Sequence, residues 1–181
     1  MAADGRFRWI IETMLVRPDD RILEIGPGSS DSLGDLAERL RDGRVVGVDR
    51  SPTAIARAAK RHAAHIDSGR VRLVQAGLEH LSREQLLDEI GPDTAGFDII
   101  FAVNVNVFWT KRPTAELTLV RDCLAENGKL CLFYGYGHPD AAVSTSPKPA
   151  PGHLTDYLTS AAFDVEVVSA GDLLGIIATP R

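Results

Sequence analysis

The alternation of strand-like and helix-like segments along the whole chain is the feature that most constrains its fold. Short apolar runs typical of buried strands alternate with stretches whose apolar residues recur every three or four positions. Such alternation is typical of an α/β fold. The strands are expected at 21–25, 45–48, 71–74, 97–103, 129–136, 165–168 and 174–178, and the helices at 7–15, 33–40, 52–66, 82–90, 113–126 and 154–162.

The two last strands predict how the sheet ends. Only a few residues separate 165–168 from 174–178, whereas a parallel crossover needs a dozen or more. We therefore expect an antiparallel hairpin. The near-continuous apolar run of 129–136 suits a strand covered on both faces. No internal repeat or linker interrupts the pattern, so residues 1–181 are predicted to form one domain.

Composition narrows the classes of function. A formal net charge of −5 disfavours capture of a nucleic-acid backbone. No apolar run approaches the roughly 20 residues of a membrane span, and the amino terminus lacks the features of a secretory signal. The two cysteines, Cys123 and Cys131, have no further ligands at metal spacing and are expected in the core. These features predict a soluble, cytoplasmic protein without nucleic-acid, membrane or metal partners.

A glycine-containing turn follows the first strand. Gly26-Pro27-Gly28 lets a ligand approach the backbone at a helix start, although an ordinary strand-to-helix turn has the same composition. Asp49 ends the second strand about 20 residues later, where a carboxylate can accept both hydroxyls of a ribose. The two features together indicate a ligand that contains adenosine.

The charge of this turn bears on which adenosine ligand binds. A dinucleotide would place its pyrophosphate at the helix start, where its fingerprint has a third glycine. Asp31 occupies that position here, and Glu24 lies close by. Carboxylates repel a pyrophosphate, whereas S-adenosylmethionine carries a sulfonium and an ammonium. The acidic rim therefore favours S-adenosylmethionine over NAD(P) or a flavin dinucleotide.

Four segments carry a resemblance to a known family. They are Ile22-Leu23-Glu24-Ile25-Gly26-Pro27-Gly28, Val46-Gly47-Val48-Asp49, Phe97-Asp98-Ile99-Ile100-Phe101-Ala102-Val103-Asn104 and Leu124-Ala125-Glu126-Asn127-Gly128-Lys129-Leu130. In this order the chain resembles the class I methyltransferases. The resemblance implies a three-layer Rossmann-like α/β sandwich whose seven-stranded sheet has the order 3-2-1-4-5-7-6, with strand 7 antiparallel. It also implies S-adenosylmethionine as cofactor and S-adenosylhomocysteine as product.

The resemblance also implies a cofactor site. The turn would pass beneath the cofactor, Asp49 would hold its ribose, and backbone near Asn104 would meet its amino-acid end. Ser30 replaces the usual third glycine, and no acidic adenine contact follows the third strand. Adenine would then rest against Ala76 and Leu78. The expected cofactor-binding residues are Glu24, Gly26, Pro27, Gly28, Asp49, Arg50, Ala76, Gly77, Leu78, Asn104 and Val105.

The methyl acceptor is harder to infer. Methyl transfer from a sulfonium needs positioning more than a general base. Phe108, Trp109 and Tyr136 are candidates for the acceptor pocket, although the first two are equally suited to anchoring the next helix. His138 is a candidate base, although a loop histidine is often merely solvated. The first helix, residues 105–112 and a lid at 137–152 are expected to close this pocket.

The sequence therefore predicts an S-adenosylmethionine-dependent methyltransferase that acts on a small molecule. Two alternatives stay open. The chain could be a non-catalytic module that binds S-adenosylmethionine, or an NAD(P)-dependent oxidoreductase, which Asp31 and the terminal hairpin disfavour.

Overall fold

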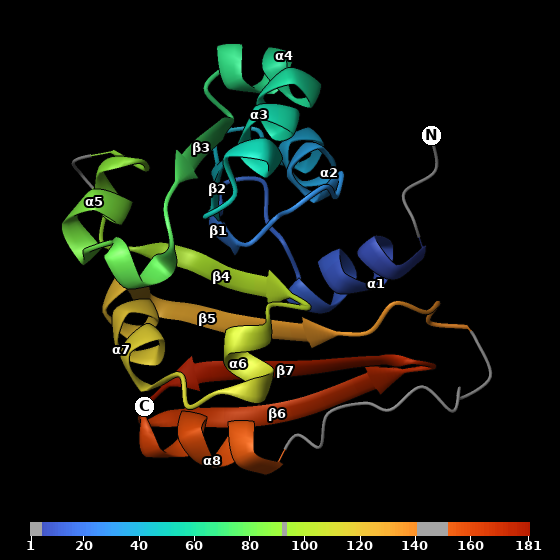
Figure 1. Cartoon of the computed structure of the whole chain (residues 1–181), viewed down its shortest axis with the longest axis vertical. Coiled ribbons are helices and arrows are strands. Elements are labelled where there is room, and N and C mark those ends of the chain that lie inside the picture. The colour runs from blue at the N-terminus through green and yellow to red at the C-terminus, as the bar shows by residue number, and fades with distance from the viewer. Residues whose placement is uncertain (1–4, 92–93, 141–151) are drawn as a thin grey trace.

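One seven-stranded sheet forms the centre of the molecule. The computed structural model describes residues 5–91, 94–140 and 152–181. The strand order is β3-β2-β1-β4-β5-β7-β6, which can be followed from top to bottom in Figure 1. The strands are β1 (Arg21–Ile25), β2 (Arg44–Asp49), β3 (Val71–Gln75), β4 (Phe97–Val103), β5 (Leu124–Tyr134), β6 (Phe163–Ala170) and β7 (Leu173–Pro180).

The pairing confirms the predicted fold class and sheet order. β1 pairs in parallel with β2 and β4, and the sheet continues in parallel to β3 on one side and β5 on the other. β7 runs antiparallel to both β5 and β6, and its arrow points against those of β4 and β5 in Figure 1. The expected terminal hairpin is therefore present.

Side-chain alternation along the strands builds a core on each face of the sheet. On β1, Leu23 and Ile25 join the core that packs under α5 to α8, whereas Ile22 joins the core under α1 to α3. This gives the three layers of the predicted sandwich. The helices are α1 (Gly5–Met14), α2 (Ser32–Arg39), α3 (Pro52–Arg61), α4 (Ala63–Asp67), η1 (Leu78–His80), α5 (Arg83–Asp88), α6 (Asn106–Thr110), α7 (Thr114–Cys123) and α8 (Gly152–Ser160).

Local capping explains where several helices begin. The Ser51 hydroxyl accepts the Ala54 backbone N–H, with Pro52 in the first turn of α3. Ser82 and Gln85 form the expected capping box at the start of α5. Asp31 precedes α2 but makes no side-chain cap bond.

Three elements differ from the sequence prediction. The helix expected over 52–66 is divided at His62 into α3 and α4, and a short helix, α6, follows β4 within residues 105–112, where no helix was expected. β5 already begins at Leu124, which pairs with Phe97 before the register shifts. Asn127-Gly128 therefore lies inside an irregular strand, and a Cβ at Gly128 would lie 2.5 Å from the Phe97 carbonyl oxygen.

Neither cysteine is exposed: Cys123 and Cys131 are free and buried, as expected for core residues. None of the helices among the described residues combines the length and hydropathy that a membrane span requires. In the same residues, His, Cys, Asp and Glu nowhere gather in a group of three or more that could hold a metal ion. Most of the predicted lid, residues 141–151, lies outside the described residues.

Candidate functional site

A cavity of about 700 Å³ opens at the carboxyl ends of β1, β2 and β4. The strand order reverses beside β1, and this kind of switch point is where open α/β sheets bind ligands. The wall contains eight of the predicted cofactor-binding residues: Gly26, Asp49, Arg50, Ala76, Gly77, Leu78, Asn104 and Val105.

The turn after β1 depends on two glycines in the left-handed region. Gly26 has φ +70° and Gly28 has φ +58°, a conformation that costs other L-residues energy. The Gly26 N–H donates to the Val48 carbonyl at 2.8 Å, which continues the β1–β2 pairing into the turn. A Cβ at Gly26 would lie 2.9 Å from Val105 Cγ2. The turn therefore keeps backbone against the floor of the cavity.

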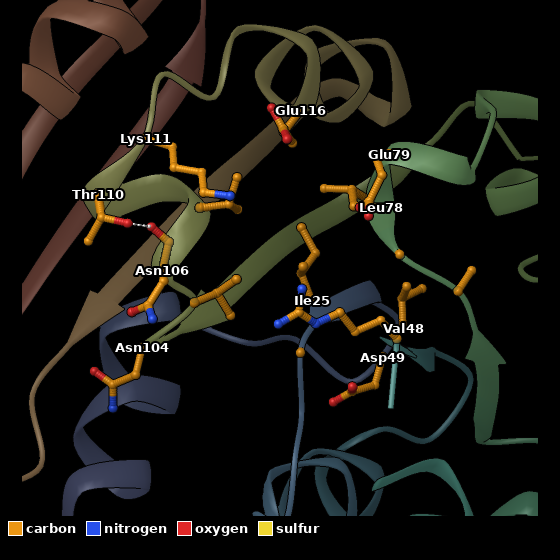
Figure 2. A pocket seen from close by; sticks show the side chains of 16 residues that line it. Ile25, Val48, Asp49, Leu78, Glu79, Asn104, Asn106, Thr110, Lys111 and Glu116 are labelled. Carbon is orange, nitrogen blue, oxygen red and sulfur yellow. Dashed lines mark hydrogen bonds between the residues drawn. The ribbon is translucent and has the colours of Figure 1, made fainter. Parts of the chain in front are cut away.

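Asp49 is held by backbone on both sides. Its Oδ2 accepts the Gly28 N–H at 3.0 Å, and its Oδ1 accepts the Ser51 N–H at 2.8 Å. Each carboxylate oxygen can accept a further hydrogen bond. Figure 2 shows Asp49 on the opposite side of the cavity from Thr110 and Lys111. A diol in the cavity can therefore bond to a carboxylate whose orientation is already fixed.

Glu24 lies behind the turn and is not part of the cavity wall. Its side chain is only 1% exposed, and the Ser32 hydroxyl lies 2.7 Å and 2.8 Å from its two oxygens. Burial raises the pKa of Glu24 to about 8; the Ser32 hydrogen bond opposes this shift and the Asp49 charge adds to it. The neutral form of Glu24 is therefore favoured at pH 7, and this buried side chain is not a source of negative charge for the rim.

Asp31 also has a different role from the one expected. Its carboxylate forms an ion pair with Arg61 at 3.1 Å, so a cation compensates its charge. Asp31 and Glu24 therefore do not supply the acidic rim. Carboxylates of Asp49, Glu79 and Glu116 do line the cavity, together with the cations of Arg50 and Lys111.

Asn104 connects the ends of β4 and β5. Its Nδ2 donates to the Gly135 carbonyl at 3.0 Å, and its Oδ1 accepts the Gly135 N–H at 2.9 Å. The residue has φ +57°, a left-handed conformation that asparagine tolerates better than most residues. Because its amide group is engaged, Asn104 presents mainly backbone to a ligand.

The three aromatic residues predicted to contact the methyl acceptor lie in different environments in the structure. Phe108 is 1% exposed and belongs to the core, so the expectation that it contacts an acceptor is wrong. Trp109 packs edge-on against Tyr134, with ring centroids 5.5 Å apart, and Tyr134 packs on Tyr136 in the same way at 6.3 Å. Tyr136 is 75% exposed. Neither Trp109 nor Tyr136 is among the residues that line the cavity.

His138 lies with α1 in a different part of the molecule. It lines a separate cavity of about 400 Å³ together with Trp9, Glu12 and Asp140. Its Nδ1 lies 3.4 Å from an Asp140 carboxylate oxygen. The first helix therefore borders this second cavity and not the one at Asp49, contrary to the expectation that it closes the ligand pocket.

Two charged wall residues, Glu79 and Glu116, lie outside the segments expected from the sequence, whereas Asn106, Val107, Thr110 and Lys111 belong to the expected segment 105–112. Asn106 and Thr110 are one helical turn apart on α6, and the Thr110 hydroxyl donates to the Asn106 carbonyl at 2.9 Å. The helical conformation of this segment was not expected, because its i, i+4 spacing covers only one turn. Pro113 and the start of α7 bring Glu116 to the same wall.

Comparison with known proteins identifies the family of this fold and cavity. A family described as "Methyltransferase domain" matches residues 23–130, which include the glycine turn, Asp49 and Asn104. The chain belongs to this family. Its membership confirms the resemblance inferred from the sequence. Among curated proteins, no sequence matches the chain significantly.

Solved structures of methyltransferases share the fold. A TehB-like SAM-dependent methyltransferase from Corynebacterium glutamicum is 18% identical, with a TM-score of 0.67 over 98% of this chain and 88% of that one. A SAM-dependent methyltransferase from Aquifex aeolicus is 14% identical, with a TM-score of 0.71 over 97% and 89%. The glycopeptide N-methyltransferase MtfA complexed with sinefungin is 16% identical, with a TM-score of 0.72 over 99% and 88%.

The cavity of this methyltransferase domain fits the cofactor predicted from the sequence. Its volume of about 700 Å³ lies in the range of small-molecule sites. Asp49 offers oriented acceptors for a diol, and the backbone at Gly26 has no room for a side chain. The wall combines three carboxylates with two cations, which suits a ligand that carries both signs of charge.

Proposed function

We propose that this protein is an S-adenosylmethionine-dependent methyltransferase that acts on a small molecule, with residues 1–181 working as one catalytic domain. The observation that carries the proposal is the Asp49 carboxylate, fixed by the Gly28 and Ser51 N–H groups and facing a cavity at the switch point of the sheet. Membership of the methyltransferase family supports the reaction class.

The cofactor would lie along the carboxyl ends of the strands. Ala76, Gly77 and Leu78 offer backbone and apolar surface for adenine, and Asp49 accepts the ribose hydroxyls. The backbone of Asn104 and Val105 meets the amino-acid end. When bound, S-adenosylmethionine supplies a methyl group already activated on a sulfonium, so this chain contributes mainly position and exclusion of water.

The acceptor is proposed to enter along α6. Asn106 and Thr110 lie across the cavity from Asp49, and Lys111 and Glu116 complete this wall (Figure 2). Hydroxyl, amide and charged groups here favour a polar small molecule. Tyr136, exposed beyond the end of β5, remains a candidate contact for a larger acceptor.

Two measurements test the proposal. Isothermal titration should show binding of S-adenosylhomocysteine and much weaker binding of NAD; comparable NAD binding would overturn the cofactor. Methyl-labelled S-adenosylmethionine should then transfer label to a component of a metabolite extract, and Asp49→Ala at the same cofactor concentration is the matched control. Tight cofactor binding without transfer to any extract would favour a non-catalytic binding module instead.

A further inference from the structure

Glu24 is enclosed beneath the cofactor turn and connected to it through two serines. The Ser32 hydroxyl bonds to the Glu24 carboxyl and lies 2.6 Å from the Ser30 hydroxyl. The Ser30 hydroxyl lies 2.9 Å from the Pro27 carbonyl, to which it donates. These contacts form an unbroken chain from a buried acid to the backbone of the turn.

Counting protons shows which form of Glu24 satisfies this chain. Each serine hydroxyl has one proton to donate. If Glu24 is neutral, it donates to Ser32, Ser32 donates to Ser30, and Ser30 donates to the Pro27 carbonyl. If Glu24 is ionised, Ser32 must donate to it. Ser30 then serves either Ser32 or Pro27, and one of these short contacts has no proton.

The chain continues through one peptide group to Asp49. Pro27 supplies the carbonyl and Gly28 the N–H of the same peptide bond, and that N–H donates to Asp49 Oδ2 at 3.0 Å. Hydrogen bonds on both ends of a peptide polarise it and fix its plane. A change at Glu24 therefore reaches the carboxylate proposed to hold ribose, with no movement of a helix or strand.

The surroundings of Glu24 favour the neutral form. Gly47 and Phe101 lie beside it on the neighbouring strands, and neither titrates. α2 presents the neutral Ser32 hydroxyl. The negative charge that acts on Glu24 is that of Asp49, while Asp31 is paired with Arg61 at the far end of the turn. Among the described residues, no cation bonds to the Glu24 carboxyl.

We propose that Glu24 is a positioning residue that acts as a neutral acid. Its carboxyl proton begins the chain through Ser32 and Ser30 that orients the Pro27–Gly28 peptide toward Asp49. The chain is a property of the free protein. Its effect on cofactor affinity rests in addition on the proposed function.

As a consequence, the orientation of the glycine turn after β1 should depend on pH. The pKa of Glu24 is raised to about 8, so the chain is intact at neutral pH and loses its first proton as the pH rises through that value. Above it, the one Ser30 proton is shared between Ser32 and the Pro27 carbonyl, so the Pro27–Gly28 peptide is held less firmly and Asp49 loses part of its support. Cofactor affinity should fall in the same range of pH.

The free protein allows a test that does not need a ligand. The Gly28 amide resonance should titrate near pH 8 in the wild type. The chemical shift of this amide should not change with pH in Glu24→Gln, because the side-chain N–H₂ replaces the donor without titrating. It should also not change in Ser30→Ala, which interrupts the chain. Glu126→Gln, near the amino end of β5, is the matched control, and its Gly28 amide should titrate as that of the wild type does.

Affinity for S-adenosylhomocysteine then tests the link to function. Between about pH 6.5 and 9.5, the wild-type affinity should fall roughly five- to tenfold relative to Glu24→Gln, the effect of about one hydrogen bond. The ratio cancels titration of the ligand's own groups. Ser30→Ala should lose this pH dependence of affinity, and should keep the pH dependence of its melting temperature because Glu24 still titrates.

The outcomes separate the two proposals. A Gly28 amide that does not titrate in the wild type, or that titrates equally in Ser30→Ala, would overturn the proton chain. If Glu24→Gln does not fold, Ser30→Ala decides alone. A wild type that binds no S-adenosylhomocysteine at any pH would refute the proposed function, and the Gly28 titration would still decide the role of Glu24.

Discussion

The Gly28 amide nitrogen lies 3.0 Å from Asp49 Oδ2, a hydrogen bond that joins the glycine turn after β1 to the end of β2. Residues 21 positions apart thereby form one unit. In the sequence they are two separate features, a turn for the cofactor and an acid for its ribose. Here the acid also holds the turn, so removing it has two effects.

Asp49→Ala should weaken cofactor binding and lower stability. Loss of charge-assisted bonds to ribose should reduce affinity on the order of 10- to 100-fold. The Gly28 and Ser51 N–H groups also lose their acceptor, which should lower the free energy of unfolding by about 1 to 3 kcal/mol. Titration calorimetry and urea denaturation measure the two effects separately.

Asp49→Asn is the control for that prediction. Its remaining carbonyl oxygen can accept one of the two backbone bonds, so its stability should lie between those of the alanine variant and the wild type. If Asp49→Ala unfolds no more easily and binds cofactor as the wild type does, the ribose assignment is wrong.

Gly26→Ala and Gly28→Ala form a matched pair. Both residues have positive φ, so both variants are strained by about 1 kcal/mol. Only at Gly26 does the new Cβ meet a side chain, Val105 Cγ2 at 2.9 Å; at Gly28 the nearest atom is 3.9 Å away. Gly26→Ala should therefore lose clearly more cofactor affinity in calorimetry. Equal losses would show that strain alone, and not close approach, explains the glycine at 26.

The sheet was predictable because its signals are local. Apolar runs such as Phe97 to Val103 mark buried strands, and the short connection between the last two strands permits only an antiparallel pair. The break at His62 was not predictable, because the apolar pattern continues through it. The early start of β5 depends on pairing between Leu124 and Phe97, which the sequence of β5 alone does not specify.

The part of the site that could be predicted is the part where a sequence motif specifies the backbone conformation. Gly26 and Asp49 lie in the cavity wall as their pattern indicates. The charges of Asp31 and Glu24 were misjudged because only folding pairs Asp31 with Arg61 and buries the Glu24 side chain. Residues 105–112 were expected at the pocket, but the helix α6 within them was not, because one helical turn has too little periodicity to recognise.

His62 should make the protein sensitive to mild acid. Burial, with the nearby Arg61 charge, lowers the pKa of His62, so the folded protein favours the neutral ring. Stability from this group is present above the unfolded pKa of about 6.5 and is lost as the pH falls through the lower folded value. Urea denaturation at a series of pH values should show this loss.

Gly34 provides an independent check on that histidine. A Cβ at Gly34 would lie 3.1 Å from two His62 ring atoms, so Gly34→Ala should displace the ring and raise the pKa of His62 toward its ordinary value. The acid sensitivity of Gly34→Ala should accordingly be smaller than that of the wild type. An unchanged pH dependence would mean that another group causes it.

His138→Ala should leave cofactor affinity unchanged within about twofold, as for a substitution away from the binding site. The ring lines the cavity beside Trp9 and Glu12, not the one beside Asp49. Calorimetry with S-adenosylhomocysteine measures this directly. A larger loss would show that the segment after β5 reaches the cofactor.

Asn104→Ala should lower both stability and cofactor affinity, because Asn104 fixes the end of β4 to β5. The variant loses two hydrogen bonds to Gly135 and leaves an alanine at φ +57°, which together should cost about 2 to 4 kcal/mol of unfolding free energy. Asn104→Gly loses the same bonds without the strain, so it should recover about 1 kcal/mol. Urea denaturation measures that difference.

Affinity for S-adenosylhomocysteine should fall in both Asn104 variants, since both free the backbone proposed to meet the amino-acid end of the cofactor. Wild-type affinity in Asn104→Gly would mean that the β4 end binds the cofactor without help from the Gly135 bonds, or does not contact it.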